Sequence, residues 1–254
     1  RVHEVRFTAY DGYPLHGWLT LPKHQPVRRA FLVGHGYGGR DQPDSWLPAG
    51  DAAGFFPYDR GLGRSRHPAL PEDPQEHVLA GIDSCEDYVL ATCAADLWTA
   101  AGLLLRLLPE GVNRLDYLGT SFAGGVGILA LPWDPRFSRA HLNIPTFGHY
   151  PLRFTLPCVG SGRAVAAHVQ RDPESAERLR YFDAAIAARH ARLPVHVAAA
   201  LFDPAVPPAG QFAIYNALPG PKELFVRHAG HFSHPGEVEE MRALRCELER
   251  FFSM

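Results

Sequence analysis

The sequence predicts a single α/β domain built on a mostly parallel, twisted sheet, with an antiparallel hairpin at its N-terminal edge and helices on both faces. Three observations predict it. Apolar and polar residues alternate at the start of the chain, short apolar runs stop at glycine-rich or polar turns, and helical stretches lie between those runs. The 254 residues are 46% hydrophobic and 20% charged, which suffices for a sizeable core. No linker is evident, so we expect residues 1–254 to form one domain.

The elements follow the chain in this order. The predicted strands are a hairpin at 2–21, turning at Asp11-Gly12, and runs at 30–33, 55–58, 115–118, 140–144, 195–201 and 224–226. The predicted helices lie at 90–108, directly after residue 121, and at 181–191, 211–218 and 237–252. Residues 145–172 hold several prolines and aromatics and interrupt the alternation. We expect this segment to form an excursion over the edge of the sheet.

Composition excludes several classes of function. A formal net charge of -2 and the lack of a Lys- or Arg-rich stripe argue against a nucleic-acid partner. The longest uncharged run is broken by glycines and a proline, so we interpret it as core and expect no membrane partner. The 4 cysteines form no CxxC pair and show no metal-ligand spacing. We expect them to be reduced, the protein to be cytoplasmic, and no metal to be bound.

The strand at 115–118 runs into Gly119-Thr120-Ser121-Phe122-Ala123, a pattern typical of a nucleophile elbow. Such an elbow needs a strand that stops abruptly and turns into a helix, and small neighbours permit that turn. Ala123 stands where G-x-S-x-G has its second glycine, adding one methyl where strand and helix approach closely. An ordinary glycine-rich turn is the alternative, and the rest of the chain decides between them.

A serine hydroxyl needs a base within hydrogen-bond reach and an acid that orients the base. Asp203 follows the predicted strand at 195–201, and His231 follows the next one, after Gly230. In a parallel sheet these strand ends meet at one edge. The order serine, aspartate, histidine is that of α/β-hydrolases, so Ser121, Asp203 and His231 are the predicted catalytic residues.

Acyl transfer also needs backbone N–H groups aimed at the developing oxyanion. One donor is expected from Phe122, directly after the serine, and the second from the loop His35-Gly36-Tyr37 after an early strand. A glycine-rich turn without a ligand is the alternative for this loop. A dinucleotide site is not expected, because no glycine-rich helix start follows it.

With these residues in hand, the chain resembles the acetyl xylan esterase and cephalosporin C deacetylase family, carbohydrate esterase family seven, from about Val5 to Pro235. The blocks that carry the resemblance are the elbow, Arg60-Gly61-Leu62-Gly63-Arg64-Ser65, Tyr181-Phe182-Asp183, Asp203 to Pro208, Tyr215-Asn216 and Gly220 to Glu223. The resemblance implies an α/β-hydrolase fold and the same catalytic triad. It also implies that the N–H groups of Tyr37 and Phe122 form the oxyanion hole, with Tyr37, Phe122 and Pro207 contacting substrate.

The chain departs from the family pattern in three ways. Phe122 and Phe232 stand where the family usually has Gln and Glu. The replacement makes the site less polar, so we expect the acyl or alcohol preference to differ from that of the family. The chain is also shorter than typical members, and we expect it to lack part of the N-terminal extension and loop length that family members use to assemble hexamers. Whether it forms a homo-oligomer is therefore left open.

The predicted activity is that of a serine esterase that removes acetyl or other short acyl groups from O-acetylated sugars, without a metal or organic cofactor. The expected partner is a small acylated substrate. A broad carboxylesterase and an acyl-peptide hydrolase use the same triad, and both remain alternatives. A catalytically silent α/β-hydrolase-fold binding protein is the alternative from another class. The Arg60 guanidinium is expected to be structural and is left out of the site.

Overall fold

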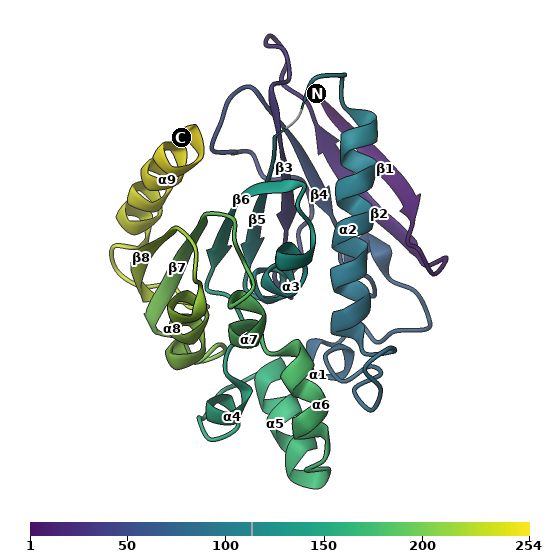
Figure 1. Cartoon of the computed structure of the whole chain (residues 1–254), viewed down its shortest axis with the longest axis vertical. Helices are drawn as coiled ribbons and strands as arrows, with labels where there is room; N and C mark the ends of the chain where they lie inside the picture. Colours follow the sequence, from purple (N-terminus) through teal and green to yellow (C-terminus); the bar gives the residue numbers. More distant parts are fainter. Residues whose placement is uncertain (113) are drawn as a thin grey trace.

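Eight strands form one sheet in the order β1-β2-β4-β3-β5-β6-β7-β8 in the computed structural model, which describes residues 1–112 and 114–254 (Figure 1). The strands are β1 (Val2–Thr8), β2 (Pro14–Thr20), β3 (Arg29–Gly34), β4 (Ala52–Pro57), β5 (Leu115–Thr120), β6 (Phe137–Asn143), β7 (Val195–Phe202) and β8 (Lys222–Ala229). The α-helices are α1 (Pro74–His77), α2 (Val89–Leu107), α3 (Phe122–Ala130), α4 (Tyr150–Arg153), α5 (Ser161–Arg171), α6 (Ser175–Leu179), α7 (Ala184–Ala188), α8 (Pro208–Ala217) and α9 (Glu237–Ser253). Short 3-10 turns occur at η1 (Gly63–Ser65), η2 (Leu131–Trp133) and η3 (Arg180–Phe182).

The sheet has the mixed topology that the sequence predicts. Strands β1 and β2 pair antiparallel, as do β2 and β4, whereas all neighbours from β4 to β8 are parallel. The parallel strands therefore end at one edge, which holds the loops after β3, β5, β6, β7 and β8. This edge is where the predicted site residues lie.

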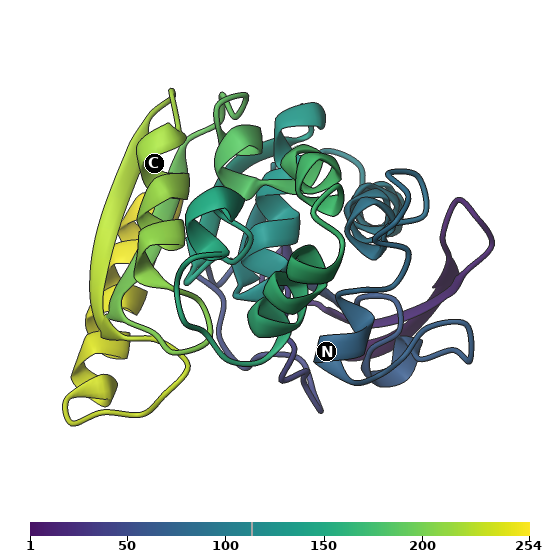
Figure 2. The ribbon, with the colours of Figure 1, turned by 90° about the horizontal axis from the view of Figure 1, so that it is seen from below.

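Helices cover both faces of the sheet, as expected. Helices α2, α3, α7 and α8 lie on one face, and their apolar side chains form the larger buried cluster. Helix α9 lies on the other face, where Leu244, Leu248, Phe251 and Phe252 pack on the sheet. The views in Figures 1 and 2 show the two layers on either side of the strands.

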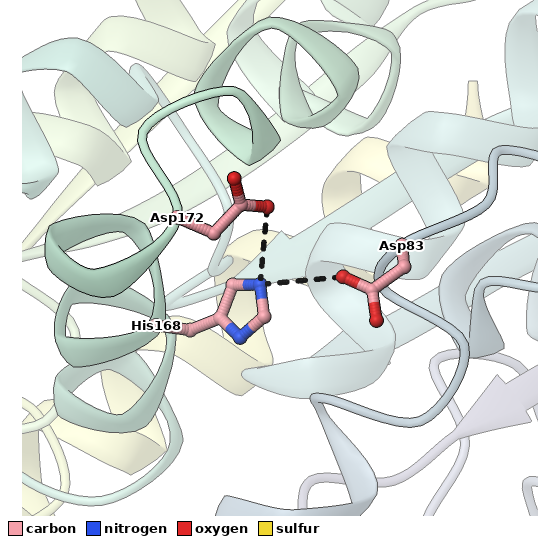
Figure 3. Close-up of side chains that lie close together, drawn as sticks. All are labelled: Asp83, His168 and Asp172. Carbon is pink, nitrogen blue, oxygen red and sulfur yellow. Dashed lines mark ion pairs between the residues drawn. The ribbon is translucent and has the colours of Figure 1, made fainter.

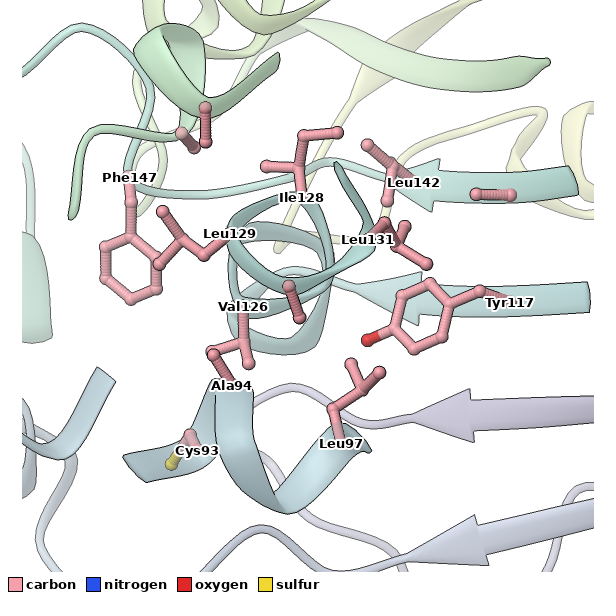
Figure 4. Close-up of a cluster of buried hydrophobic side chains, with 14 of the residues drawn as sticks. Cys93, Ala94, Leu97, Tyr117, Val126, Ile128, Leu129, Leu131, Leu142 and Phe147 are labelled. Carbon is pink, nitrogen blue, oxygen red and sulfur yellow. The ribbon is translucent and has the colours of Figure 1, made fainter. Parts of the chain in front are cut away.

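Helix α3 is central to the core because it is buried on every side. Figure 4 shows it between the sheet, represented by Tyr117 on β5 and Leu142 on β6, and helix α2, represented by Ala94 and Leu97. All four side chains belong to the same buried cluster. The elbow at the start of α3 is thus held by packing on both sides.

The helix predicted at 181–191 is wrong in extent: the structure has η3 at Arg180–Phe182 and a separate short α7. Asp183 breaks the helix because its carboxylate caps α7, accepting from the N–H groups of Ala185 and Ile186. The same carboxylate accepts from the N–H groups of His149 and Tyr150 at the start of α4. A tertiary contact therefore overrides the continuous helical pattern.

The excursion predicted at 145–172 lies beyond the carboxyl ends of the parallel strands and holds α4 and α5 (Figure 1). It continues through α6 to η3, about ten residues further than expected. The N–H of Val159 donates to the carbonyl of Pro204, which directly follows Asp203. The excursion is thereby tied to the loop after β7.

Helix α2 is, in the described part of the chain, the one helix whose length and apolar composition would suffice to cross a membrane. Half of its most apolar window is buried in the fold, where it packs against β3 and α3. We interpret α2 as the core helix that the sequence predicts. Cys85, Cys93, Cys158 and Cys246 are free thiols.

Candidate active site

Ser121 lies on the sharp turn between β5 and α3, with φ 54° and ψ -110°. A positive φ is strained for a residue with a side chain, and such strain persists only where the surrounding packing imposes it. Gly36, in the loop after β3, passes so close that a Cβ there would lie 3.2 Å from the Cβ of Ser121. The predicted elbow is therefore formed.

The departure from G-x-S-x-G at Ala123 is accommodated by a glycine on the neighbouring strand. A Cβ built on Gly34 of β3 would lie only 2.5 Å from the Cβ of Ala123. Gly34 pairs with Gly119 across the parallel strands β3 and β5. The extra methyl of Ala123 thus occupies space that a side chain at Gly34 would need.

The structure brings together the three residues predicted to form the triad. Ser121 Oγ lies 2.7 Å from His231 Nε2, and His231 Nδ1 lies 2.8 Å from Asp203 Oδ2. Both distances are typical of hydrogen bonds. His231 follows the end of β8 at φ 56°, and the N–H of Gly230 before it donates to the carbonyl of Phe202. These backbone features direct the imidazole toward the serine.

The two neighbouring histidines do not compete for this position. His228 Nδ1 lies 2.8 Å from Glu240 Oε2, and His234 Nε2 lies 3.6 Å from Glu240 Oε1. Both imidazoles therefore face the start of α9. Of the three histidines near the end of β8, His231 is the one beside Ser121.

Asp203 is buried and held by a set of hydrogen bonds that leave one direction for the imidazole. Its Oδ1 accepts from the N–H groups of Ala205 and Val206, each at 2.9 Å. Its Oδ2 accepts from Gln211 Nε2 at 3.1 Å, in addition to facing His231. Three residues of its own loop and of α8 therefore fix the carboxylate.

Gln211 is a residue of the site that sequence reasoning missed. Its side chain is fully buried on α8, where Oε1 accepts from the N–H of Ala200 and Nε2 donates to Asp203 and to the carbonyl of Val206. The signal in the sequence was a long polar side chain on a mostly apolar helix, eight positions after the acid. We regard it as a positioning residue, since it contacts Asp203 but not Ser121.

The two backbone donors expected for an oxyanion hole occupy suitable places. Phe122 is the first residue of α3, where N–H groups have no partner within the helix. Tyr37 lies next to Gly36, the loop residue that passes close to Ser121. Among the described residues, neither N–H donates a backbone hydrogen bond outside the helices and strands.

The side chains of these two residues form part of an aromatic cluster beside the serine. The rings of Tyr37 and Phe122 are 4.4 Å apart, and Phe147, in the excursion, lies 5.8 Å from Phe122. Tyr37 is also tied to His77, with 2.9 Å between its hydroxyl and Nδ1. Phe122 has no exposed surface, so its side chain is not available to a substrate.

Exposed apolar side chains lie near His231, on the side facing solvent. Phe202 and Phe232 are more than half exposed, and their rings are 5.7 Å apart. Phe232 is one of the two positions where the sequence departs from the family pattern. Pro207, the third predicted substrate contact, is buried at the start of α8.

Arg60 is structural, as expected. Its guanidinium donates to both carboxylate oxygens of Asp96 on α2, each at 2.6 Å, and to Asp11 at 2.7 Å, while stacking on Tyr13. Burial raises the pKa of Asp96 to about 6 even though the guanidinium opposes this shift. The Arg60 turn thus joins the N-terminal hairpin to the core helix.

A second group of polar side chains lies away from the elbow, between α5 and the loop before α2. His168 Nε2 is 3.7 Å from Asp83 and 3.9 Å from Asp172, and Figure 3 shows both carboxylates facing the same nitrogen. Such a set resembles a cation site, but Arg178 donates to Asp172 at 2.6 Å and lies 3.8 Å from Asp83. Because the chain itself supplies the cation, we assign no metal to this cluster.

The chain is similar to a known family of esterases along nearly its whole length. Residues 1–245 match the family model described as acetyl xylan esterase (AXE1). The chain belongs to the acetyl xylan esterase family. This family assignment agrees with the resemblance found in the sequence blocks.

Solved structures of other acetyl xylan esterases are similar to this family member. The acetyl xylan esterase from Paenibacillus sp. R4 is 28% identical to this chain, with a TM-score of 0.83. The match covers 97% of this chain and 83% of the Paenibacillus chain. Acetyl xylan esterase 1 from Thermoanaerobacterium sp. JW/SL YS485 is 21% identical with a TM-score of 0.82 and the same two coverages. At 21% identity, the similarity to this second structure shows a shared fold only.

More distant structures show that the fold is shared beyond the family. The acylaminoacyl peptidase from Pyrococcus horikoshii is 16% identical to this chain, with a TM-score of 0.75. The match covers 100% of this chain but only 41% of the peptidase chain. This likeness carries no information on substrate. No curated protein sequence matches the chain.

Proposed function

We propose that this member of the acetyl xylan esterase family is a serine esterase that removes acetyl or other short acyl groups from O-acetylated sugars. The observation that carries the proposal is the chain of hydrogen-bond distances from Ser121 through His231 to Asp203 at the carboxyl edge of the sheet. Family membership and the acetyl xylan esterase from Paenibacillus sp. R4 support the acetyl ester as the substrate class.

The geometry suits attack by the serine hydroxyl. In the free enzyme the Ser121 O–H donates to His231 Nε2, and His231 Nδ1–H donates to Asp203. As Oγ bonds to the ester carbonyl carbon, its proton passes to Nε2, and the imidazolium then returns a proton to the departing alcohol oxygen. A water molecule activated by the same nitrogen releases acetate and restores the serine. The nucleophile, base and acid all come from the chain, so the mechanism requires no cofactor.

The oxyanion formed in each step would be held by the N–H groups of Phe122 and Tyr37. The first stands at the start of α3, where the helix dipole also favours negative charge. The second belongs to the loop that passes close to the serine. Losing one such donor typically lowers turnover by about 100- to 1,000-fold, so this pair would contribute strongly to catalysis.

The decisive experiment compares wild type and Ser121→Ala on p-nitrophenyl acetate and on an acetylated xylo-oligosaccharide. By analogy with other triads we expect a loss of about six decades in kcat. Ser253→Ala, at an exposed position in the last turn of α9, is the matched control and should keep full activity. Unchanged turnover in Ser121→Ala would remove this serine from the mechanism.

The silent binding protein is separated from the enzyme by a fluorophosphonate probe, which reacts only with an activated serine. We expect wild type to be labelled at Ser121 and Ser121→Ala to remain unlabelled. A folded wild-type protein that resists the probe and hydrolyses no acetate ester would favour the binding protein.

A further inference from the structure

The connection from β3 to β4 leaves part of the sheet uncovered. Parallel neighbours are usually joined by a helix that packs on the sheet, but residues 35–51, all described, contain neither helix nor strand. On the face of α9 the carboxyl-end halves of β3, β5 and β6 therefore form the floor of a pocket of about 540 Å³. Its walls are the loop 36–46 and helix α9. This volume is in the range of small-molecule sites.

Arg40, in this loop, lines the pocket and is nine-tenths buried, with a side-chain exposure of 7%. Its Nε and Nη1 atoms are buried without a hydrogen-bond partner in the described residues. The guanidinium lies over the ring of Phe56, and the carboxylate of Asp44, itself more than half exposed, is 3.8 Å from Nη1. That separation exceeds a hydrogen bond. A buried guanidinium without hydrogen-bond acceptors is costly, unless a ligand supplies them.

The other acid close enough to act on Arg40 does not neutralise it. Burial raises the pKa of Asp59 to about 7, so near neutral pH this carboxyl is protonated in a large part of the molecules. Burial also lowers the pKa of Arg40, as expected for a cation that lacks a close counter-charge.

We propose that this pocket binds the oxyanion group, a carboxylate or phosphate, of a small polyhydroxylated molecule. The planar guanidinium of Arg40 would take two oxygens of the anion, a geometry that arginine forms with both groups. A second arginine, Arg245 of α9, also lines the pocket. Thr120, Asn143 and Ser45 supply donors and acceptors for hydroxyl groups, and the Trp46 indole offers a flat apolar surface.

The pocket is separate from the predicted ester site but shares two of its elements. Thr120 on its floor directly precedes Ser121, and the loop 36–46 carries both Tyr37 and Arg40. The anion would therefore bind close to the elbow, in a pocket whose lining includes neither Ser121 nor His231. Binding does not require turnover, so its test is independent of the proposed esterase activity.

The test measures thermal unfolding and calorimetric binding of the full chain with sodium glucuronate and with inorganic phosphate. Sodium chloride at equal ionic strength and neutral glucose are the reference solutes. We expect one or both anions to raise the unfolding midpoint by about 5 °C near saturation, beyond the effect of either reference. The stronger of the two anions identifies the ligand as a sugar acid or a phosphate ester. No rise beyond sodium chloride, or an equal rise with glucose, would overturn the proposal.

Substitutions then assign the binding to the pocket. Arg40→Met keeps the length and the apolar contacts but removes the charge, and should weaken binding by about tenfold or more. In the absence of anion, the unfolding midpoint of Arg40→Met should be no lower than that of wild type. If Arg40 were purely structural, its replacement would lower the midpoint. Lys23→Met, an exposed cation outside the pocket, is the control. If Arg40→Met does not fold, Arg245→Met decides: weaker binding supports the pocket, and unchanged binding overturns it.

Discussion

Gly230 lies directly against the carboxylate of Asp203: a Cβ built on this glycine would be 2.3 Å from Asp203 Oδ2. That oxygen is the one that faces His231 Nδ1. The glycine before the histidine therefore leaves room for the carboxylate of Asp203. Its backbone φ is not positive, so an alanine would act through contact with Asp203 rather than through backbone strain.

Gly230→Ala should accordingly impair catalysis while leaving the fold intact. The added methyl would push Asp203 or the backbone of the His231 loop by about 1 Å, and a displacement of that size costs on the order of 100-fold in rate. We expect kcat on p-nitrophenyl acetate to fall by that factor. Gly50→Ala, where a Cβ would meet no atom within 4 Å, is the control. Wild-type kcat in Gly230→Ala would show that the acid tolerates displacement.

Gln211→Glu tests the positioning of Asp203. The new side chain keeps an oxygen to accept from Ala200 but replaces the amide that donates to Asp203 and Val206. Like charge beside the acid and a lost donor should lower kcat by at least about tenfold, with little change in KM. Gln170→Glu, exposed on α5, is the control. A change confined to the unfolding midpoint would make Gln211 merely structural.

Gly34 and Ala123 should behave as a coupled pair. Gly34→Ala places two methyl carbons 2.5 Å apart and is expected to destabilise the protein by about 1–3 kcal/mol. Ala123→Gly removes the opposing methyl, so the double variant should recover part of that loss. The recovery is partial because the Tyr117 hydroxyl also lies 2.9 Å from the added carbon. Urea unfolding of both single variants and the double variant measures the coupling, and strictly additive losses would contradict it.

The elements that sequence reasoning predicted well depend on local patterns. The elbow at Ser121 needed only a strand that ends among small residues, and the places of Asp203 and His231 followed from the rule that parallel strands end at one edge. Of the three histidines in this stretch, the structure places His231 beside Ser121, whereas His228 and His234 lie beside Glu240 at the start of α9.

The features that could not be predicted from the sequence depend on contacts between residues far apart in the chain. Residues 181–191 form a continuous helical pattern, and nothing local shows that Asp183 must accept from the N–H groups of His149 and Tyr150. Gln211 likewise becomes part of the site only because α8 turns back against the loop of Asp203. The side chain of Phe122 faces the core rather than the substrate, which depends on where Tyr37 and Phe147 pack.

Stability should fall with rising pH because of Asp59. Burial raises the pKa of its carboxyl from 3.8 to about 7, so the folded protein holds a proton that the unfolded chain releases above pH 3.8. The free energy of unfolding therefore decreases as pH rises from 3.8 to about 7, and this contribution is constant at higher pH. Asp59→Asn should be more stable than wild type at pH 8, by at most roughly 4 kcal/mol, and the difference should shrink toward pH 5. Urea unfolding at several pH values checks this, and a difference independent of pH would contradict it.

The aromatic cluster beside the serine predicts a preference for short acyl groups. The rings of Tyr37 and Phe147 pack on the ring of Phe122, which directly follows Ser121, and Phe122 and Phe147 are almost entirely buried. An acetyl group needs little room there, whereas an octanoyl chain would have to displace packed rings at a cost of a few kcal/mol. We expect kcat/KM for p-nitrophenyl acetate to exceed that for the octanoate by about 100-fold.

Phe147→Ala tests whether the cluster sets this limit. Removing the ring opens space next to Phe122, so the ratio of acetate to octanoate should fall by about tenfold or more, mainly through faster cleavage of the octanoate. Phe7→Ala, on the edge strand β1 at the far end of the sheet order, removes a ring of the same size without touching the cluster and should leave the ratio unchanged. A wild-type protein that prefers the octanoate would make it a general carboxylesterase, because a site that accepts eight carbons does not select acetate by size.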